Sequence, residues 1–175
     1  MAKGLGAGYQ PIAATLARKH VVDAIASLSG GFEHGHTYIG HAAACAAGVA
    51  VQRCLDEQEL LTKVAAMGRE LFDVLHKSIG DHPNVGDIRG RGLFAGIELV
   101  ADRETKEPFP AEEKLASKIK SAAMDAGLIC YPGAGSVDGK RGAHILLAPP
   151  FIVESKHLDE LAGRLNTVFN TVFAA

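Results

Sequence analysis

The segment NVGDIRGRGLFAGIELVA, residues 84–101, decides the fold of most of this chain. Residues 93–100 are mainly apolar and predict a strand. The four glycines of the segment, at positions 86, 90, 92 and 96, predict sharp bends around that strand. We therefore expect a hairpin-like pair of strands here.

Periodic apolar segments lie on both sides of this pair. Over residues 60–79, apolar side chains recur every three or four positions with charged residues between them, which predicts a surface helix that ends before Gly80 and Pro83. The segments after the pair predict a charged loop, a helix over 111–126, strands over 128–131 and 143–148, and a closing amphipathic helix over 155–173. Residues 56–175 are therefore expected to form an α+β or α/β domain with its own core.

Residues 1–55 have a different character. An apolar run over 12–19 predicts a strand, residues 21–28 predict a short helix, and the glycine- and histidine-rich residues 29–40 predict a loop. The run HAAACAAGVAVQRCL from His41 is small and apolar on all sides, which is typical of a helix buried by close neighbours. These elements cannot close a hydrophobic core, so the chain is expected to be incomplete on its N-terminal side.

Composition excludes several classes of function. The 175 residues contain 18 Lys and Arg against 20 Asp and Glu, and no basic block exceeds two residues, which argues against a nucleic-acid partner. No apolar stretch approaches the roughly 18 residues of a membrane span, and the start has no secretory signal, so a cytoplasmic protein without membrane contact is expected. The three cysteines, Cys45, Cys54 and Cys130, lack CxxC spacing and are interpreted as reduced, mostly buried thiols.

Lys3 is the first candidate for chemistry. It lies in AKGLGAGYQP, where glycines let the backbone approach a flat cofactor closely. A lysine becomes a Schiff-base nucleophile only when desolvation or a neighbouring cation holds it unprotonated. The residue pattern alone leaves a second interpretation open, a solvated lysine near a flexible chain end.

Four blocks in this order and spacing resemble the class III (omega) aminotransferases, which are pyridoxal 5'-phosphate (PLP) enzymes of fold type I. They are KGLGAGYQPIAATL, FEHGHTYIGHAAACAAGVAV, VGDIRGRGLFAGIELVADRETKEPF, and GLICYPG with HILLAPPFIV. The resemblance covers residue 3 to about residue 168. It implies the C-terminal part of such an enzyme: residues 1–55 as the end of the large PLP-binding domain and residues 56–175 as the small C-terminal α/β domain.

The same resemblance implies an activity and two cofactor residues. The activity is transfer of an amino group from an amine or omega-amino acid to a 2-oxo acid such as pyruvate, by a homodimer. Lys3 maps onto the lysine that binds PLP as a Schiff base and then moves the substrate proton. Thr37 maps onto the threonine that reaches the PLP phosphate of the neighbouring subunit, and a helix start after it would also favour an anion. Its alternative role is to cap that helix.

Substrate binding is less well marked. Several family members have an arginine just ahead of the APP turn, where this chain has Ile145, Leu146 and Leu147. Arg141 in the preceding loop is therefore the candidate for the substrate carboxylate, and a solvated loop cation is its alternative. Arg89 and Arg91 have the same two interpretations, with a structural role favoured.

Two other site types fit the sequence less well. His34, His36 and His41 resemble a ligand spacing, but only Glu33 accompanies them, so no metal site is expected. The GLGAG turn lacks the spacing of a nucleotide-binding loop.

The family features that precede the lysine are a phosphate loop, an aromatic stacked on the ring and an aspartate at the pyridinium nitrogen. Because Lys3 is the third residue, the chain is expected to be inactive on its own. The alternative function is a non-catalytic, truncated remnant that keeps only an oligomerisation surface.

Overall fold

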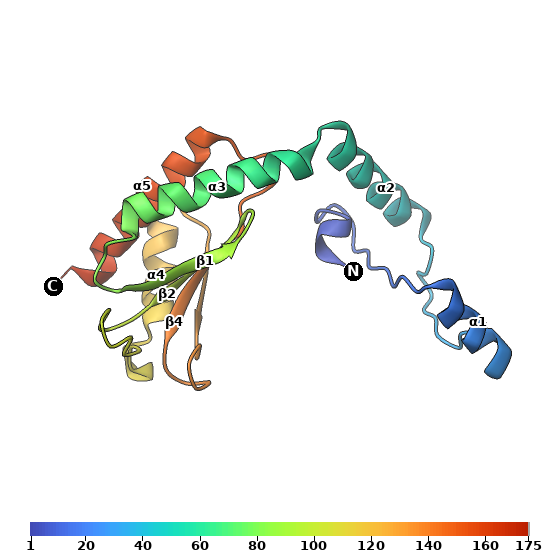
Figure 1. The fold of residues 1–175 in the computed structure, drawn as a ribbon, viewed down its shortest axis with the longest axis horizontal. Helices are drawn as coiled ribbons and strands as arrows, with labels where there is room; N and C mark the ends of the chain where they lie inside the picture. The colour runs from blue at the N-terminus through green and yellow to red at the C-terminus, as the bar shows by residue number, and fades with distance from the viewer. Residues whose placement is uncertain (175) are drawn as a thin grey trace. The chain divides into compact units, whose positions relative to one another are not determined.

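A computed structural model describes residues 1–174 (Figure 1). Contacts within the chain define two compact units, Met1–Leu60 and Leu61–Ala175, each with its own architecture. The sequence pattern predicts the change of character after residue 55, and the contacts place the division after Leu60.

The second unit is built on a four-stranded antiparallel sheet. Its strands are β1 (Val85–Arg91), β2 (Phe94–Leu99), β3 (Tyr131–Ala134) and β4 (Ala143–Leu147), in the order β1-β2-β4-β3. The predicted hairpin is confirmed as β1 and β2, in which Ile88 pairs with Ile97 and Arg91 with Phe94.

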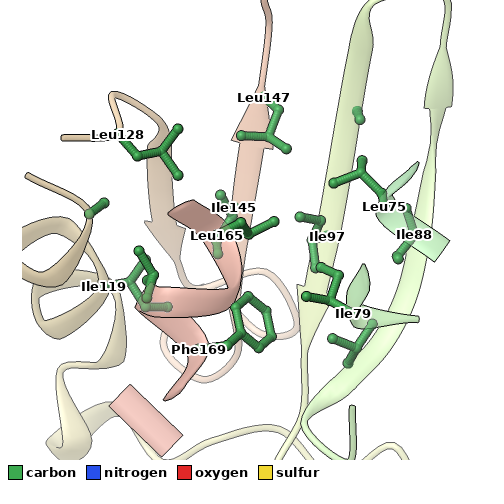
Figure 2. Packing of buried hydrophobic residues seen from close by; sticks show 14 of the residues in the cluster. Leu75, Ile79, Ile88, Ile97, Ile119, Leu128, Ile145, Leu147, Leu165 and Phe169 are labelled. Atoms are coloured by element: carbon green, nitrogen blue, oxygen red, sulfur yellow. The ribbon is translucent and has the colours of Figure 1, made fainter. Parts of the chain in front are cut away.

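Helices cover one face of this sheet, which gives a two-layer α/β unit. They are α3 (Leu60–Ile79), α4 (Leu115–Asp125) and α5 (Ser155–Phe173). Alternate residues of β2 and β4 are buried, as the period of a strand requires. Figure 2 shows Leu75 and Ile79 of α3 beside Ile88 and Ile97, and Leu165 of α5 beside Ile145. This cluster is the core of the unit.

Two predicted elements of this unit are placed differently. The helix expected over 111–126 is split, because Lys114 has a left-handed φ of 50° between a 3₁₀ turn, η2 (Ala111–Glu113), and α4. The strand expected over 128–131 is wrong by about three residues, since β3 begins at Tyr131. Leu128 instead belongs to the turn that closes the C-terminal end of α4. Its N–H donates to the carbonyl of Ala123 at 2.7 Å, and its side chain is buried in the core.

The first unit contains η1 (Lys3–Leu5), α1 (Lys19–Leu28) and α2 (Ala42–Glu57). The strand expected over 12–19 is wrong: residues 11–18 are irregular and pair with no strand of the described chain. Two backbone hydrogen bonds join this segment to the start of the chain. The amine of Met1 donates to the carbonyl of Ala14 at 2.7 Å, and the N–H of Ala14 donates to the carbonyl of Met1 at 2.8 Å.

Burial in this unit is much lower than the composition predicts. Only Ala44 and Gly48 of α2 are buried, so within the described chain the helix lacks the close neighbours that its composition calls for. All three cysteines are free, but their expected burial is not found, because Cys45 is exposed while Cys54 and Cys130 are half-buried. Partial burial raises the pKa of the Cys130 thiol. Among residues 1–174, no helix combines the length and apolarity that a membrane crossing needs.

Candidate active site

Lys3 begins the short turn η1 in a left-handed conformation, with φ at 50°. The turn is closed by the N–H of Gly6, which donates to the Lys3 carbonyl at 3.2 Å, and Ala7 follows with a φ of 48°. Non-glycine residues at such angles are uncommon and cluster at functional sites. The Lys3 side chain is exposed, and within residues 1–174 its amine has no hydrogen-bond or ion-pair partner.

The glycine-rich turn is held on the side of α2. A Cβ on Gly6 would lie 2.6 Å from Cγ2 of Ile12, and a Cβ on Gly48 would lie 3.1 Å from Cδ1 of the same isoleucine. The Gln52 amide donates from Nε2 to the carbonyl of Leu5 at 3.3 Å. The two glycines thus permit a close approach that a side chain would block, and α2 positions the turn that carries Lys3.

Thr37 begins a four-residue turn that leads directly into α2. The interpretation of Thr37 as the helix cap is wrong, because His41 is the N-cap residue and its Nδ1 accepts the N–H of Ala44 at 3.3 Å. The first N–H groups of α2, on Ala42 and Ala43, have no partner within the helix. Thr37 therefore lies five residues before Ala42, the start of a helix with free N–H donors.

A cavity of about 980 Å³ lies between residues 10–14 and the start of α2. Its lining includes Gln10, His36, Tyr38, His41 and Cys45, so the residues on both sides of Thr37 contribute to it. Lys3 is not among the lining residues. The cavity is lined mostly by apolar residues, with the imidazoles of His36 and His41 and the phenol of Tyr38 near Thr37.

The two candidate cofactor residues are associated with different parts of α2. Gly48 and Gln52, which hold the Lys3 turn, follow Ala42 by six and ten residues. At a rise of 1.5 Å per residue, these contacts lie roughly 9 to 15 Å along the helix from its start. The structure therefore brings Lys3 and Thr37 to one helix but not to one point on it.

Arg141 is already engaged with two carboxylates. Its Nε donates to Asp138 at 2.8 Å and its Nη1 to Glu107 at 3.3 Å, while its backbone N–H also donates to Asp138, at 2.7 Å. The bond from the Arg141 guanidinium, followed by those from the backbone N–H groups of Arg141 and Lys140, lowers the pKa of Asp138 to about 2. A substrate carboxylate would compete with Asp138 and Glu107 for this guanidinium, whose Nη2 makes no hydrogen bond within residues 1–174.

Arg89 is paired in a similar way on the open face of the sheet. Its Nη1 lies 2.9 Å from Asp87 and 2.5 Å from Glu98, and these bonds raise the pKa of Arg89. This geometry favours a structural role for Arg89 over binding of a substrate carboxylate. In the described chain, residues 1–174, no three His, Cys, Asp or Glu side chains converge as metal ligands would.

Sequence reasoning missed His41 as a helix cap. The position was recognisable, because it directly precedes the apolar run that forms α2. Histidine at this position did not indicate a cap, because Ser, Thr, Asp and Asn are the usual capping residues.

The aminotransferase class-III family model matches residues 1–169, so the chain belongs to the class III aminotransferase family. An uncharacterized aminotransferase of Schizosaccharomyces pombe is 42% identical over 175 residues, which are 100% of this chain and 38% of that protein. The chain thus spans well under half the length of the curated relatives it matches.

Solved structures give the same assignment. A Bacillus anthracis aminotransferase is 34% identical with a TM-score of 0.87, over 97% of this chain and 38% of that one. An amine transaminase from an uncultivated Pseudomonas species, solved in a PLP-bound form, is 31% identical with a TM-score of 0.85, over 98% and 37% of the two chains. The fold is that of part of a PLP-dependent transaminase of fold type I.

Proposed function

We propose that this chain is the lysine-bearing part of a PLP-dependent aminotransferase that moves an amino group from an amine or omega-amino acid to a 2-oxo acid such as pyruvate. The observation that carries the proposal is the placement of Lys3. The family match includes it, and the structure presents it in an exposed left-handed turn braced on α2. A cytoplasmic homodimer is proposed as the working form.

The donor set fits PLP chemically. An aldehyde requires a primary amine, which Lys3 supplies, and a phosphate requires hydroxyl and N–H donors, which Thr37 and the start of α2 supply. PLP provides the electron sink for the reaction. The role proposed for the Lys3 amine is to hold the cofactor and to carry the proton at the α-carbon of the substrate.

Thr37 is proposed to serve the cofactor site of the neighbouring subunit. The separation of roughly 9 to 15 Å along α2 between the start of the helix and the contacts of the Lys3 turn supports this division. Each site of a dimer would then combine the lysine of one protomer with the threonine of the other.

Arg141 is proposed to bind the carboxylate of the acceptor, in competition with Asp138 and Glu107. A bidentate guanidinium is suited to that task. Arg141→Ala should then raise the KM for the 2-oxo acid more than the KM for a carboxylate-free amine. Equal changes in both KM values would assign Arg141 to loop structure alone.

A second function is supported by the exposed apolar side chains of residues 1–60, among them Leu28 at 88% exposure. It is a non-catalytic chain whose remaining property is an oligomerisation surface. Activity in a complete protein separates the two proposals.

The experiment uses a chimera in which this chain replaces the matching segment of the S. pombe relative. Lys3→Ala and Thr37→Ala should each be impaired, and mixed dimers of the two variants should regain activity, because one of their two sites has neither defect. Thr15→Ala, at an exposed position of the irregular segment, is the matched control. Mixtures no better than the separate variants, with subunit exchange verified, would contradict the shared site.

A further inference from the structure

His41 joins the turn that carries Thr37 to the first turn of α2. Its backbone N–H donates to the carbonyl of Tyr38 at 3.1 Å, and its own carbonyl accepts the N–H of Cys45 at 2.9 Å. Its imidazole Nδ1 accepts the N–H of Ala44 at 3.3 Å. One residue therefore closes the turn on one side and caps the helix on the other.

The side-chain bond exists in only one protonation state. Nδ1 accepts a hydrogen bond only when the imidazole is neutral and carries its proton on Nε2. A protonated ring has donors at both nitrogens, so it cannot accept the N–H of Ala44. The ring would then also place a positive charge at the positive end of the helix dipole, where a cation is unfavourable.

No acidic residue in the first turn of α2 offsets that charge. The titratable side chains that face His41 are Tyr38, whose ring centroid lies 5.9 Å away, and His36 and Cys45, which line the same cavity. Gln10, across the cavity, is polar and uncharged. The lining therefore contains no carboxylate that would stabilise a protonated His41.

We propose that His41 is a positioning residue: its neutral imidazole caps α2 and thereby steadies the backbone that follows the Thr37 turn, and protonation removes this cap. The link to catalysis rests on the proposed function, because it matters only if Thr37 holds the phosphate. The structural device itself does not depend on the cofactor.

The test is NMR of the full 175-residue chain without PLP, at pH 7.5 and 5.5, at a concentration low enough that sedimentation velocity shows no aggregates. Four proteins are compared: wild type, His41→Ala, which has no acceptor, His41→Asn, which accepts without ionising, and His34→Asn, a control in the same loop. The readouts are the imidazole ¹⁵N shifts of residue 41, the amide shift of Thr37, and the hydrogen-exchange protection of the Ala44 amide.

At pH 7.5, His41→Ala should lower the protection of Ala44 about 2- to 30-fold, the effect of losing a helix cap. It should move the Thr37 amide shift as well. The wild type should show the same two changes at pH 5.5, whereas His41→Asn should keep the protected state at both pH values. The control should behave as the wild type.

Three results would overturn the proposal. In the first, the Ala44 amide of the wild type exchanges at pH 7.5 as fast as in an unfolded chain. In the second, the protection of Ala44 changes with pH equally in the wild type and in His41→Asn. In the third, the protection of Ala44 changes while the amide shift of Thr37 does not. None of these readouts uses PLP, so a failure here is separate from a failure of Lys3 or Thr37 in the complementation experiment.

Discussion

The imidazole of His82 packs edge-on against the phenyl ring of Phe169, with ring centroids 4.9 Å apart and planes at 81°. Phe169 is almost fully buried, and a second ring of α5, Phe173, lies 5.3 Å from the imidazole. Nδ1 of His82 accepts the N–H of Asn84 at 3.1 Å, which again requires a neutral ring. His82 thus attaches the end of α5 to the turn between α3 and β1.

This arrangement predicts acid sensitivity of the second unit. Burial lowers the pKa of His82 below its usual 6.5, so the unfolded chain binds a proton more readily than the folded one. The free energy of unfolding contributed by His82 is therefore complete above pH 6.5 and decreases as the pH falls below it.

Urea unfolding followed by circular dichroism between pH 8 and pH 5 measures this dependence. The decrease should be larger for the wild type than for His82→Gln, which cannot ionise. Equal pH dependence in the two proteins would show that His82 does not carry the effect.

A pair of glycines tests the packing of the hairpin. Gly90 has a φ of 154°, and a Cβ there would overlap the carbonyl oxygen of Phe94 and approach Phe72. Gly90→Ala should lower the free energy of unfolding by about 2 to 4 kcal/mol. In Gly163→Ala, on an exposed position of α5 with open space around it, the helix should gain about 0.5 to 1 kcal/mol. The same denaturation experiment compares the two, and a Gly90→Ala protein as stable as the wild type would contradict the packing.

Residues 1–60 should drive self-association of the chain. Tyr9, Leu16, Leu28, Phe32 and Tyr38 are each at least 72% exposed, and large uncovered apolar surface seldom remains in contact with water. Sedimentation velocity should show oligomers or aggregates that grow with concentration. Residues 61–175, which contain the core cluster, should sediment as a monomer. A monodisperse monomer of the full chain would count against the prediction.

Periodicity located the hairpin and the long helices of the second unit, because these elements are determined by local pattern, but it did not locate β3 or the break before α4. The helix 155–173 is found as predicted, since its apolar residues recur on one face. β3 was displaced because pairing with β4 determines its position, and its Pro132 and Gly133 give no strand signal of their own. The segment 12–19 has a strand-like composition but no partner strand in the described chain, and pairing is what makes a strand.

The candidate site was accessible from the sequence only in part. The roles of Lys3 and Thr37 came from the family resemblance, whereas the attachment of the Lys3 turn to α2 depends on Gln52, about fifty residues from Lys3 in sequence. No local pattern reports such a distant contact. The pairing of Arg141 with Glu107 was hidden for the same reason.

The most direct test of the central claim is to identify the residue that binds PLP covalently. The chimera with the S. pombe relative is loaded with PLP, reduced with borohydride and digested, and the modified peptide is sequenced by mass spectrometry. Because a primary amine that condenses with an aldehyde is trapped by reduction, the pyridoxyl group should be found on Lys3, and Lys3→Ala should lose both the label and the visible absorbance. A correctly folded chimera labelled at another lysine, or labelled equally in Lys3→Ala, would contradict the account.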